Sequence, residues 1–112
     1  MARDPKPVEF RATSLDDLRA FPDDARRMVG FQLDRVQHGE EPLDWKPMQS
    51  VGRGVREIRV RGADGAFRVI YIASLGDAIY VLHCFQKTSQ RTAREDIALA
   101  VRRYKRLVED LR

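Results

Sequence analysis

The sequence contains a single cysteine, Cys84, among its 112 residues. One cysteine excludes an internal disulfide and any metal site built from several cysteines. The two histidines do not stand at metal-ligand spacing, and the carboxylates form no cluster of the kind that binds hard cations. We therefore expect a protein that uses neither a metal ion nor a cofactor.

Long apolar runs are also absent. No stretch approaches the roughly 18 residues that a membrane-spanning helix needs. The segment from Met1 to Pro7 lacks the apolar core of a signal peptide, so we expect a cytoplasmic protein with no membrane partner. A chain of this length has room for one hydrophobic core, and we expect residues 1–112 to form a single domain.

Charge is distributed unevenly along the chain. Residues 1–45 carry 7 basic and 10 acidic side chains, whereas residues 46–112 carry 14 basic and 7 acidic ones. The net charge is therefore −3 for the first part and +7 for the second. A basic second half indicates a surface that binds a polyanion. The alternative is a merely basic protein whose charges are spread over all faces.

The first half of the chain predicts one strand and two helices. Alternating residues over 8–12 predict a short strand. Residues 14–38 have the apolar spacing of a helical hairpin, in which Ser14 would be the first N-cap and Asp17 would complete a weak capping box. The glycines and prolines of residues 39–54 are typical of a loop.

The second half predicts three strands and a helix. β-Branched and aromatic residues mark the strands, and the short turns between them favour an antiparallel meander. Thr92 and Glu95 form a capping box before a helix that runs to the end. The predicted strands are residues 55–61, 67–73 and 79–86. The expected fold is α+β, in the order β-α-α-β-β-β-α, with a mostly antiparallel sheet, an N-terminal helical hairpin and a C-terminal helix.

Cations within apolar strands carry the functional argument. Arg68 lies inside the strand 67–73, where a buried cation needs a partner. A phosphate of a polyanion is one candidate partner, since a guanidinium can hold it with two hydrogen bonds. Glu57 on the neighbouring strand is the other. The pattern leaves both possibilities open.

The next strand ends in two further ionisable residues. Strict alternation predicts that His83 and Lys87 share a face with Ile79, Val81 and Phe85. His83 is either an acid or base near neutral pH or a structural, hydrogen-bonded histidine. Lys87 either binds phosphate or donates a proton, or it is an ordinary solvated lysine at a strand end.

Arginines surround these strands and are candidates for contacts with an RNA backbone. Alternation places Arg56 on one face of its strand and Arg59 and Arg61 on the other. Only one of these two sets can share a surface with Arg68. The candidate RNA-binding residues are Arg53, Arg56, Arg59, Arg61, Arg91 and Arg94.

Three segments resemble a known family. They are Trp45-Lys46-Pro47-Met48, Phe67-Arg68-Val69-Ile70-Tyr71, and the stretch from Val81 to Thr92, which is similar to a strand ending in Phe-x-Lys-Lys-Thr-x-Lys-Thr-Pro. Together with the order of elements, they resemble the RelE/HigB toxin superfamily, in particular its phage-derived HigB-like branch. Thr88 replaces the second lysine of that motif, and Ala93 replaces its proline.

The resemblance implies the toxin of a type II toxin–antitoxin pair, which cuts mRNA in the ribosomal A site. It implies mRNA and the ribosome as partners, together with a helix-turn-helix antitoxin encoded by an adjacent gene. Promoter DNA would be bound only through that antitoxin. A ParE-type protein that poisons DNA gyrase, or a phage-derived binding protein without activity, is the alternative.

Cleavage of this kind uses the 2′-hydroxyl of RNA as nucleophile on the adjacent phosphate and needs no metal. It requires a base, cations that stabilise the developing charge and an acid for the leaving 5′-oxygen. Arg68, Lys87 and His83 are the candidates for these roles by their chemistry, and the resemblance favours a functional Arg68. The resemblance also adds Lys46, which stands where family members place a basic catalytic residue. Lys46 is otherwise an ordinary loop cation.

Overall fold

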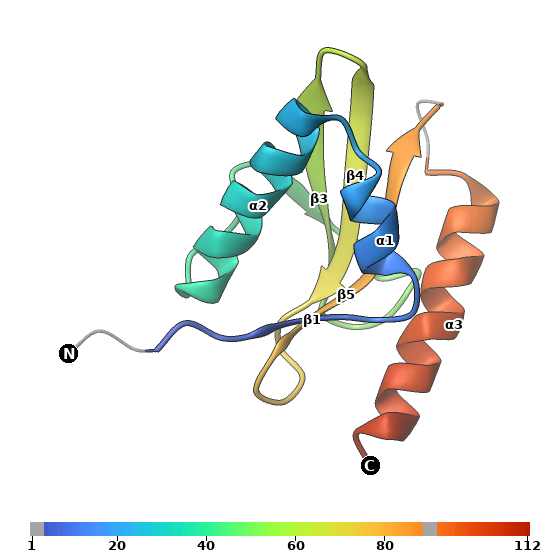
Figure 1. Cartoon of the computed structure of the whole chain (residues 1–112). Coiled ribbons are helices and arrows are strands. Elements are labelled where there is room, and N and C mark those ends of the chain that lie inside the picture. Colours follow the sequence, from blue (N-terminus) through green and yellow to red (C-terminus); the bar gives the residue numbers. More distant parts are fainter. Residues whose placement is uncertain (1–3, 89–91) are drawn as a thin grey trace.

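One sheet forms the framework of the molecule (Figure 1). The computed structural model describes residues 4–88 and 92–112, and within them five strands lie in the order β1-β5-β4-β3-β2. The strands are β1 (Val8–Phe10), β2 (Trp45–Pro47), β3 (Val55–Gly62), β4 (Gly65–Ile72) and β5 (Ile79–Lys87). The helices are α1 (Ser14–Arg19), α2 (Asp23–Gln37) and α3 (Arg94–Asp110).

Short turns join the three long strands. β3 and β4 pair as far as Gly62 and Gly65, so only Ala63 and Asp64 reverse the chain. Gly65 has a φ of +128°, which residues with a side chain rarely adopt. β5 pairs antiparallel with β4, and β2 pairs antiparallel with β3, whereas β1 runs parallel to β5. The mostly antiparallel sheet of the predicted α+β fold is confirmed.

The helices cover both faces of the sheet. α1 and α2 pack on one face, where Val29 and Ile58 belong to the first hydrophobic core (Figure 1). α3 packs on the other face, where Ile70 and Leu107 belong to the second core. None of the helices within residues 4–88 and 92–112 is long and apolar enough to cross a membrane.

Both predicted capping boxes are wrong. α1 has Thr13 as its N-cap, and Ser14 is a buried helical residue whose hydroxyl donates to the carbonyl of Val81 at 3.2 Å. α3 has Ala93 as its N-cap, and the hydroxyl of Thr92 donates instead to the Glu57 carboxylate. Each hydroxyl satisfies a tertiary acceptor, which the local sequence pattern does not reveal.

The segment predicted as a loop contains a short strand. β2 occupies Trp45–Pro47 within the predicted loop 39–54, and Lys46 pairs there with Glu57 of β3. The three-residue strand lies at an edge of the sheet, where a proline is tolerated because one side of the strand has no partner. The order is therefore β-α-α-β-β-β-β-α, one strand more than predicted.

The predicted alternation along β5 is also wrong. The pairing of β4 with β5 shifts register between Ile70 and Tyr71, which marks a β-bulge. Ile79 and Val81 therefore pack into the core beneath α1 and α2, and Phe85 packs into the core beneath α3. His83 pairs with Ile70 on this second face. After the bulge, His83, Phe85 and Lys87 pair with Ile70, Arg68 and Ala66 on the face where α3 packs.

Candidate functional site

Strand register gathers cations from four strands on the face of the sheet where α3 packs. The middle row of paired residues is Arg59–Arg68–Phe85, and it lies between the rows Arg61–Ala66–Lys87 and Lys46–Glu57–Ile70–His83. Residues paired across neighbouring strands project from the same face of a sheet. We call Lys46, Arg59, Arg61, Arg68 and Lys87 the cationic face. All five members were predicted: Lys46, Arg68 and Lys87 as catalytic residues, and Arg59 and Arg61 as RNA-binding residues.

A buried carboxylate lies beneath the cationic face. The Glu57 side chain is fully buried, and its Oε1 lies 3.5 Å from Arg68 Nε and 3.7 Å from Lys46 Nζ. Its Oε2 accepts a hydrogen bond of 2.9 Å from the Thr92 hydroxyl. A buried carboxylate needs opposite charges and hydrogen-bond donors to remain ionised. Glu57 therefore links β2, β3, β4 and the segment that leads into α3.

Arg68 is the most deeply buried cation of this face. Its side chain is 7% exposed, and one terminal nitrogen donates to the carbonyl of Phe67 at 3.0 Å. Arg68 Nε is buried and has no hydrogen-bond partner, since its distance to Glu57 is too long for one. Burial lowers the pKa of Arg68, and the charge of Glu57 opposes this effect. Because Nε is buried, a ligand from solvent would reach Arg68 only through the other atoms of the guanidinium group.

A small cavity of about 50 Å³ opens beside Arg68. Arg59, Arg61 and Asp44 contribute to its lining, and Arg59 Nε lies 3.9 Å from the Asp44 carboxylate. Arg59 and Arg61 are both exposed at the surface. The cavity therefore connects the buried guanidinium of Arg68 with two solvated ones, an arrangement suited to an anion.

Lys87 lies at the end of β5, one row away from Arg68. Its pKa is lowered, mainly by desolvation and next by repulsion from Arg68. The negative charge of Glu57 raises the pKa again, and the positive charge of Lys46 lowers it. A lysine with a lowered pKa transfers its proton more readily than a solvated lysine does.

His83 is held in place by a carboxylate. Its Nε2 lies 2.7 Å from Asp96 Oδ1 near the start of α3, and its ring stacks on Phe85 with centroids 4.7 Å apart. The side chain is 7% exposed, and Nδ1 is buried without a hydrogen-bond partner. This arrangement matches the structural alternative for His83, because the ring joins β5 to α3.

Several predicted RNA-binding residues lie elsewhere. Arg56 points to the opposite face of β3, where its guanidinium lies 3.9 Å from the centre of the Trp45 ring and 3.8 Å from Glu41. Arg53 is exposed in the loop before β3, and Arg94 is exposed as the first residue of α3. Arg91 lies outside the described residues. The predicted separation of Arg56 from Arg59 and Arg61 is confirmed.

Glu57 and Thr92 are the members of the site that the catalytic and binding predictions lacked. The sequence indicated Glu57 only as an alternative partner for Arg68, and Thr92 only as a helix cap. Their spacing in sequence is 35 residues, and their contact depends on how α3 packs against the sheet. Across the described part of the chain, no group of three or more His, Cys, Asp or Glu residues is placed to hold a metal ion.

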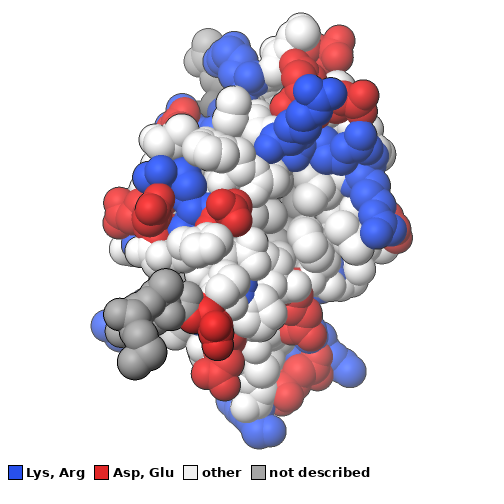
Figure 2. Space-filling model, turned by 60° about the vertical axis from the view of Figure 1, so that its left-hand side comes forward, with Lys and Arg blue, Asp and Glu red and all other residues white. Residues whose placement is uncertain are grey.

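The second half of the sequence is basic, but the surface of the molecule is not positively charged on every side. On the side that lies at the left of Figure 1, basic and acidic side chains are interspersed around a broad area without charges (Figure 2). The net charge of the second half therefore says less about a binding surface than the strand register does. The register identifies which cations share a face.

The sequence matches a family model over residues 16–105, which is most of the chain. The family is described as "Phage derived protein Gp49-like (DUF891)". The chain belongs to this family. Among curated proteins, no sequence matches the chain significantly.

Solved structures share the fold of this Gp49-like protein. A mutant of the Escherichia coli toxin RelE in the free state aligns with a TM-score of 0.63 and 17% identity, covering 88% of this chain and 97% of that chain. The toxin–antitoxin complex RelBE2 from Mycobacterium tuberculosis contains a chain that aligns with a TM-score of 0.53 and 20% identity, covering 74% of this chain and 99% of that one. The fold is therefore that of the RelE-type toxins, which confirms the resemblance seen in the sequence.

Proposed function

We propose that this Gp49-like protein is the toxin of a type II toxin–antitoxin pair and that it cleaves mRNA on the ribosome. The observation that carries the proposal is the cationic face, where Arg68 borders a small cavity and shares one face of the sheet with Lys46 and Lys87. The family match and the RelE-type fold support the same activity. The chain would act as a single domain in the cytoplasm.

The proposed reaction begins with attack of a 2′-hydroxyl on the neighbouring phosphate, and the proton of that hydroxyl passes to solvent water. The phosphate gains negative charge as the new bond forms, and the positive charge of Arg68 would stabilise it. Lys46 and the exposed guanidinium groups of Arg59 and Arg61 would hold the flanking backbone. The products would be a 2′,3′-cyclic phosphate and a free 5′-hydroxyl, and no metal takes part.

Lys87 is our candidate for the proton donor to the leaving 5′-oxygen. Its lowered pKa suits proton transfer, and its place at the end of β5 is one residue row from Arg68. Glu57 would act indirectly, because it lies too deep to meet substrate and instead holds Arg68 and Lys46 in position. His83 would support the site through Asp96 rather than carry a proton.

We propose an antitoxin as the protein partner. RelBE2 is described as a toxin–antitoxin complex, and it supplies the analogy. The antitoxin would be a helix-turn-helix protein encoded by the adjacent gene, and it alone would contact promoter DNA. A stable specific complex would bury at least about 1,000 Å² of surface.

Expression in bacteria tests the proposed function. The chain alone should arrest growth and truncate transcripts within coding regions, and co-expression of the adjacent gene should relieve the arrest and yield a complex that purifies together. Normal growth at high soluble expression would contradict the toxin assignment. Inhibition of DNA supercoiling with intact transcripts would contradict the ribonuclease assignment and favour a gyrase poison.

A further inference from the structure

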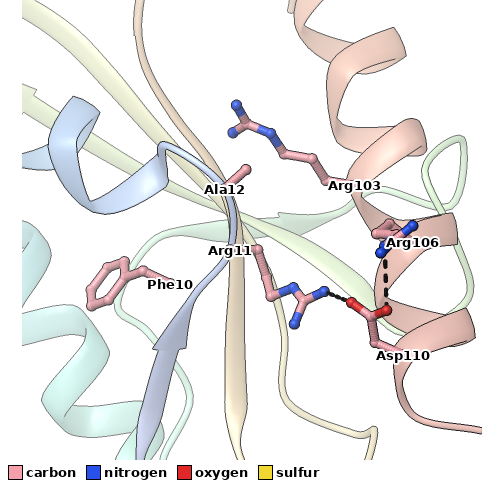
Figure 3. A pocket seen from close by; sticks show the side chains of 6 residues that line it. All are labelled: Phe10, Arg11, Ala12, Arg103, Arg106 and Asp110. Carbon is pink, nitrogen blue, oxygen red and sulfur yellow. Dashed lines mark hydrogen bonds and ion pairs between the residues drawn. The ribbon is translucent and has the colours of Figure 1, made fainter.

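A second cluster of arginines lies at the junction of β1 and α3, away from the cationic face. It surrounds a pocket of about 280 Å³, lined by Phe10, Arg11, Ala12, Arg103, Arg106 and Asp110 (Figure 3). The backbone N–H of Arg11 donates to the carbonyl of Val81, six residues before Lys87 on β5. At about 3.3 Å per strand residue, the pocket lies roughly 20 Å from the end of β5. The proposed cleavage does not use it.

The pocket already holds one carboxylate. Asp110 is bonded to a terminal nitrogen of Arg11, and its other oxygen lies 3.3 Å from Arg106 Nε (Figure 3). A single carboxylate therefore bridges two guanidinium groups from different elements. Arg106 remains largely exposed, with 73% of its side chain accessible, so most of its hydrogen-bonding capacity is free.

Arg103 contributes a charge that no carboxylate in the described part of the chain neutralises directly. Its two terminal nitrogens donate to neutral oxygens, the carbonyl of Leu82 at 2.8 Å and the hydroxyl of Thr13 at 2.9 Å. Asp17 accepts a hydrogen bond from the same Thr13 hydroxyl and does not form an ion pair with Arg103. These bonds fix the guanidinium above Ala12, and desolvation lowers its pKa.

The backbone at the wall of the pocket has an unusual conformation. Ala12 has a φ of +50°, a left-handed conformation that an alanine rarely adopts. The flanking residues Arg11 and Ser14 hold it there, because the Ser14 N–H donates to the carbonyl of Arg11. Ala12 lines the pocket, and the side chain of Arg11 reaches Asp110 on α3. Strained backbone of this kind concentrates at binding sites.

We propose that this pocket binds the carboxylate of an acidic peptide segment from a partner protein. The Asp110 bridge shows that a carboxylate fits between the guanidinium groups of Arg11 and Arg106, and the free donors of Arg106 can hold a second carboxylate beside the positive charge of Arg103. The methyl group of Ala12 and the aliphatic stems of the arginines would contact an apolar residue next to the acidic one. A phosphodiester chain would bring several negative charges close to Asp110, whereas the peptide side chain brings one.

Titration of the full chain with short peptides tests the proposal. The probes are acetyl-Leu-Glu-Leu-amide and its glutamine counterpart, and the measurement is the NMR shift of the arginine Nε–H resonances. We expect Arg103 and Arg106 to shift saturably with the glutamate peptide, and we expect the glutamine peptide to bind about tenfold more weakly because it lacks the charge. Absence of a saturable shift with the glutamate peptide would overturn the proposal.

Matched variants separate this pocket from general electrostatics. Arg106→Gln should weaken binding of the glutamate peptide by about tenfold, whereas Arg102→Gln, the exposed neighbour outside the pocket, should leave it unchanged. Both sites are on the surface of α3, so both variants should fold. Equal weakening by the two variants would overturn the proposal.

A stronger response of the same resonances to inorganic phosphate or a short RNA would overturn it in favour of a phosphate site. None of these outcomes depends on RNA cleavage.

Discussion

At the scale of single residues, the central relationship is between Arg68 and Glu57. The sequence offered either a phosphate or Glu57 as the partner of Arg68, and the geometry accommodates both. Glu57 Oε1 lies 3.5 Å from Arg68 Nε without hydrogen-bonding it, and Arg68 also borders the cavity that it shares with Arg59 and Arg61. A carboxylate at this distance supplies charge without occupying the donor. The pair therefore maintains a buried cation ready to bind an anion.

A pair of variants tests this relationship. Arg68→Ala should destabilise the fold by about 3 kcal/mol, because Glu57 would remain buried without its main counter-ion. Replacing both side chains, Glu57→Gln with Arg68→Gln, should recover much of that loss, since no uncompensated charge remains. Urea unfolding of the wild type, Arg68→Ala and the double variant compares their free energies of unfolding. A double variant no more stable than Arg68→Ala would show that the two side chains do not depend on each other.

The pH dependence of cleavage tests Lys87 as a proton donor. A donor must be protonated, so the rate should decline as pH rises through the pKa of Lys87. Glu57 raises that pKa and Lys46 lowers it. Glu57→Gln should therefore move the alkaline decline to lower pH, and Lys46→Gln should move it to higher pH. Rate profiles that shift in the same direction, or not at all, would exclude Lys87 from this role.

At the scale of secondary-structure elements, one carboxylate joins α2 to the β3–β4 hairpin. Asp24 Oδ2 accepts a hydrogen bond from the backbone N–H of Ala63 at 2.8 Å, and Oδ1 accepts one from Ala25. These bonds lower the pKa of Asp24. The stabilisation is present above the ordinary pKa of an aspartate and is lost as pH falls through the lowered one.

Substitution of Asp24 should reveal this connection. Asp24→Ala should lower the melting temperature at neutral pH, and the difference from the wild type should shrink as the solution is acidified through the pKa of Asp24. Asp23→Ala removes only an exposed ion pair with Arg26 and should cost less. Thermal unfolding at several pH values measures both. An effect of Asp24→Ala that persists at the lowest pH would contradict the charge-based explanation.

The sequence predicted the elements that depend on neighbouring residues in the chain. It did not predict the features that depend on contacts between distant residues. Apolar spacing and turn residues predicted the helical hairpin, the three-stranded meander and α3, and the structure confirms each of them. The bulge in β5 and the hydroxyl bonds of Ser14 and Thr92 depend on distant acceptors, so the sequence pattern led to wrong faces and wrong caps. β2 was missed because an edge strand of three residues has little pattern to detect.

At the scale of the whole molecule, the sheet converts separated cations into one surface. The sequence predicted Lys46, Arg59, Arg61, Arg68 and Lys87 as members of a site, and strand register places all five on one face of the sheet. The sequence placed Arg56 on the other face and offered Glu57 as a partner of Arg68. It could not predict that Arg56 stacks on Trp45 or that Glu57 is fully buried and bonded to Thr92, since both follow from packing across strands. The RelE-type fold thus explains how a modest net charge yields a concentrated cationic face.

Cleavage of mRNA in a reconstituted translation reaction tests the central claim most directly. The wild-type chain should cut ribosome-bound mRNA and leave a 5′-hydroxyl on the downstream fragment. The folded double variant Glu57→Gln with Arg68→Gln should cut about 10²–10³ times more slowly, because its phosphate-stabilising cation is gone. Arg56→Gln, which removes a strand arginine from the opposite face, should cut at the wild-type rate. Absence of cleavage by the folded wild type, or equal loss in the two variants, would contradict the assignment of a ribonuclease site to the cationic face.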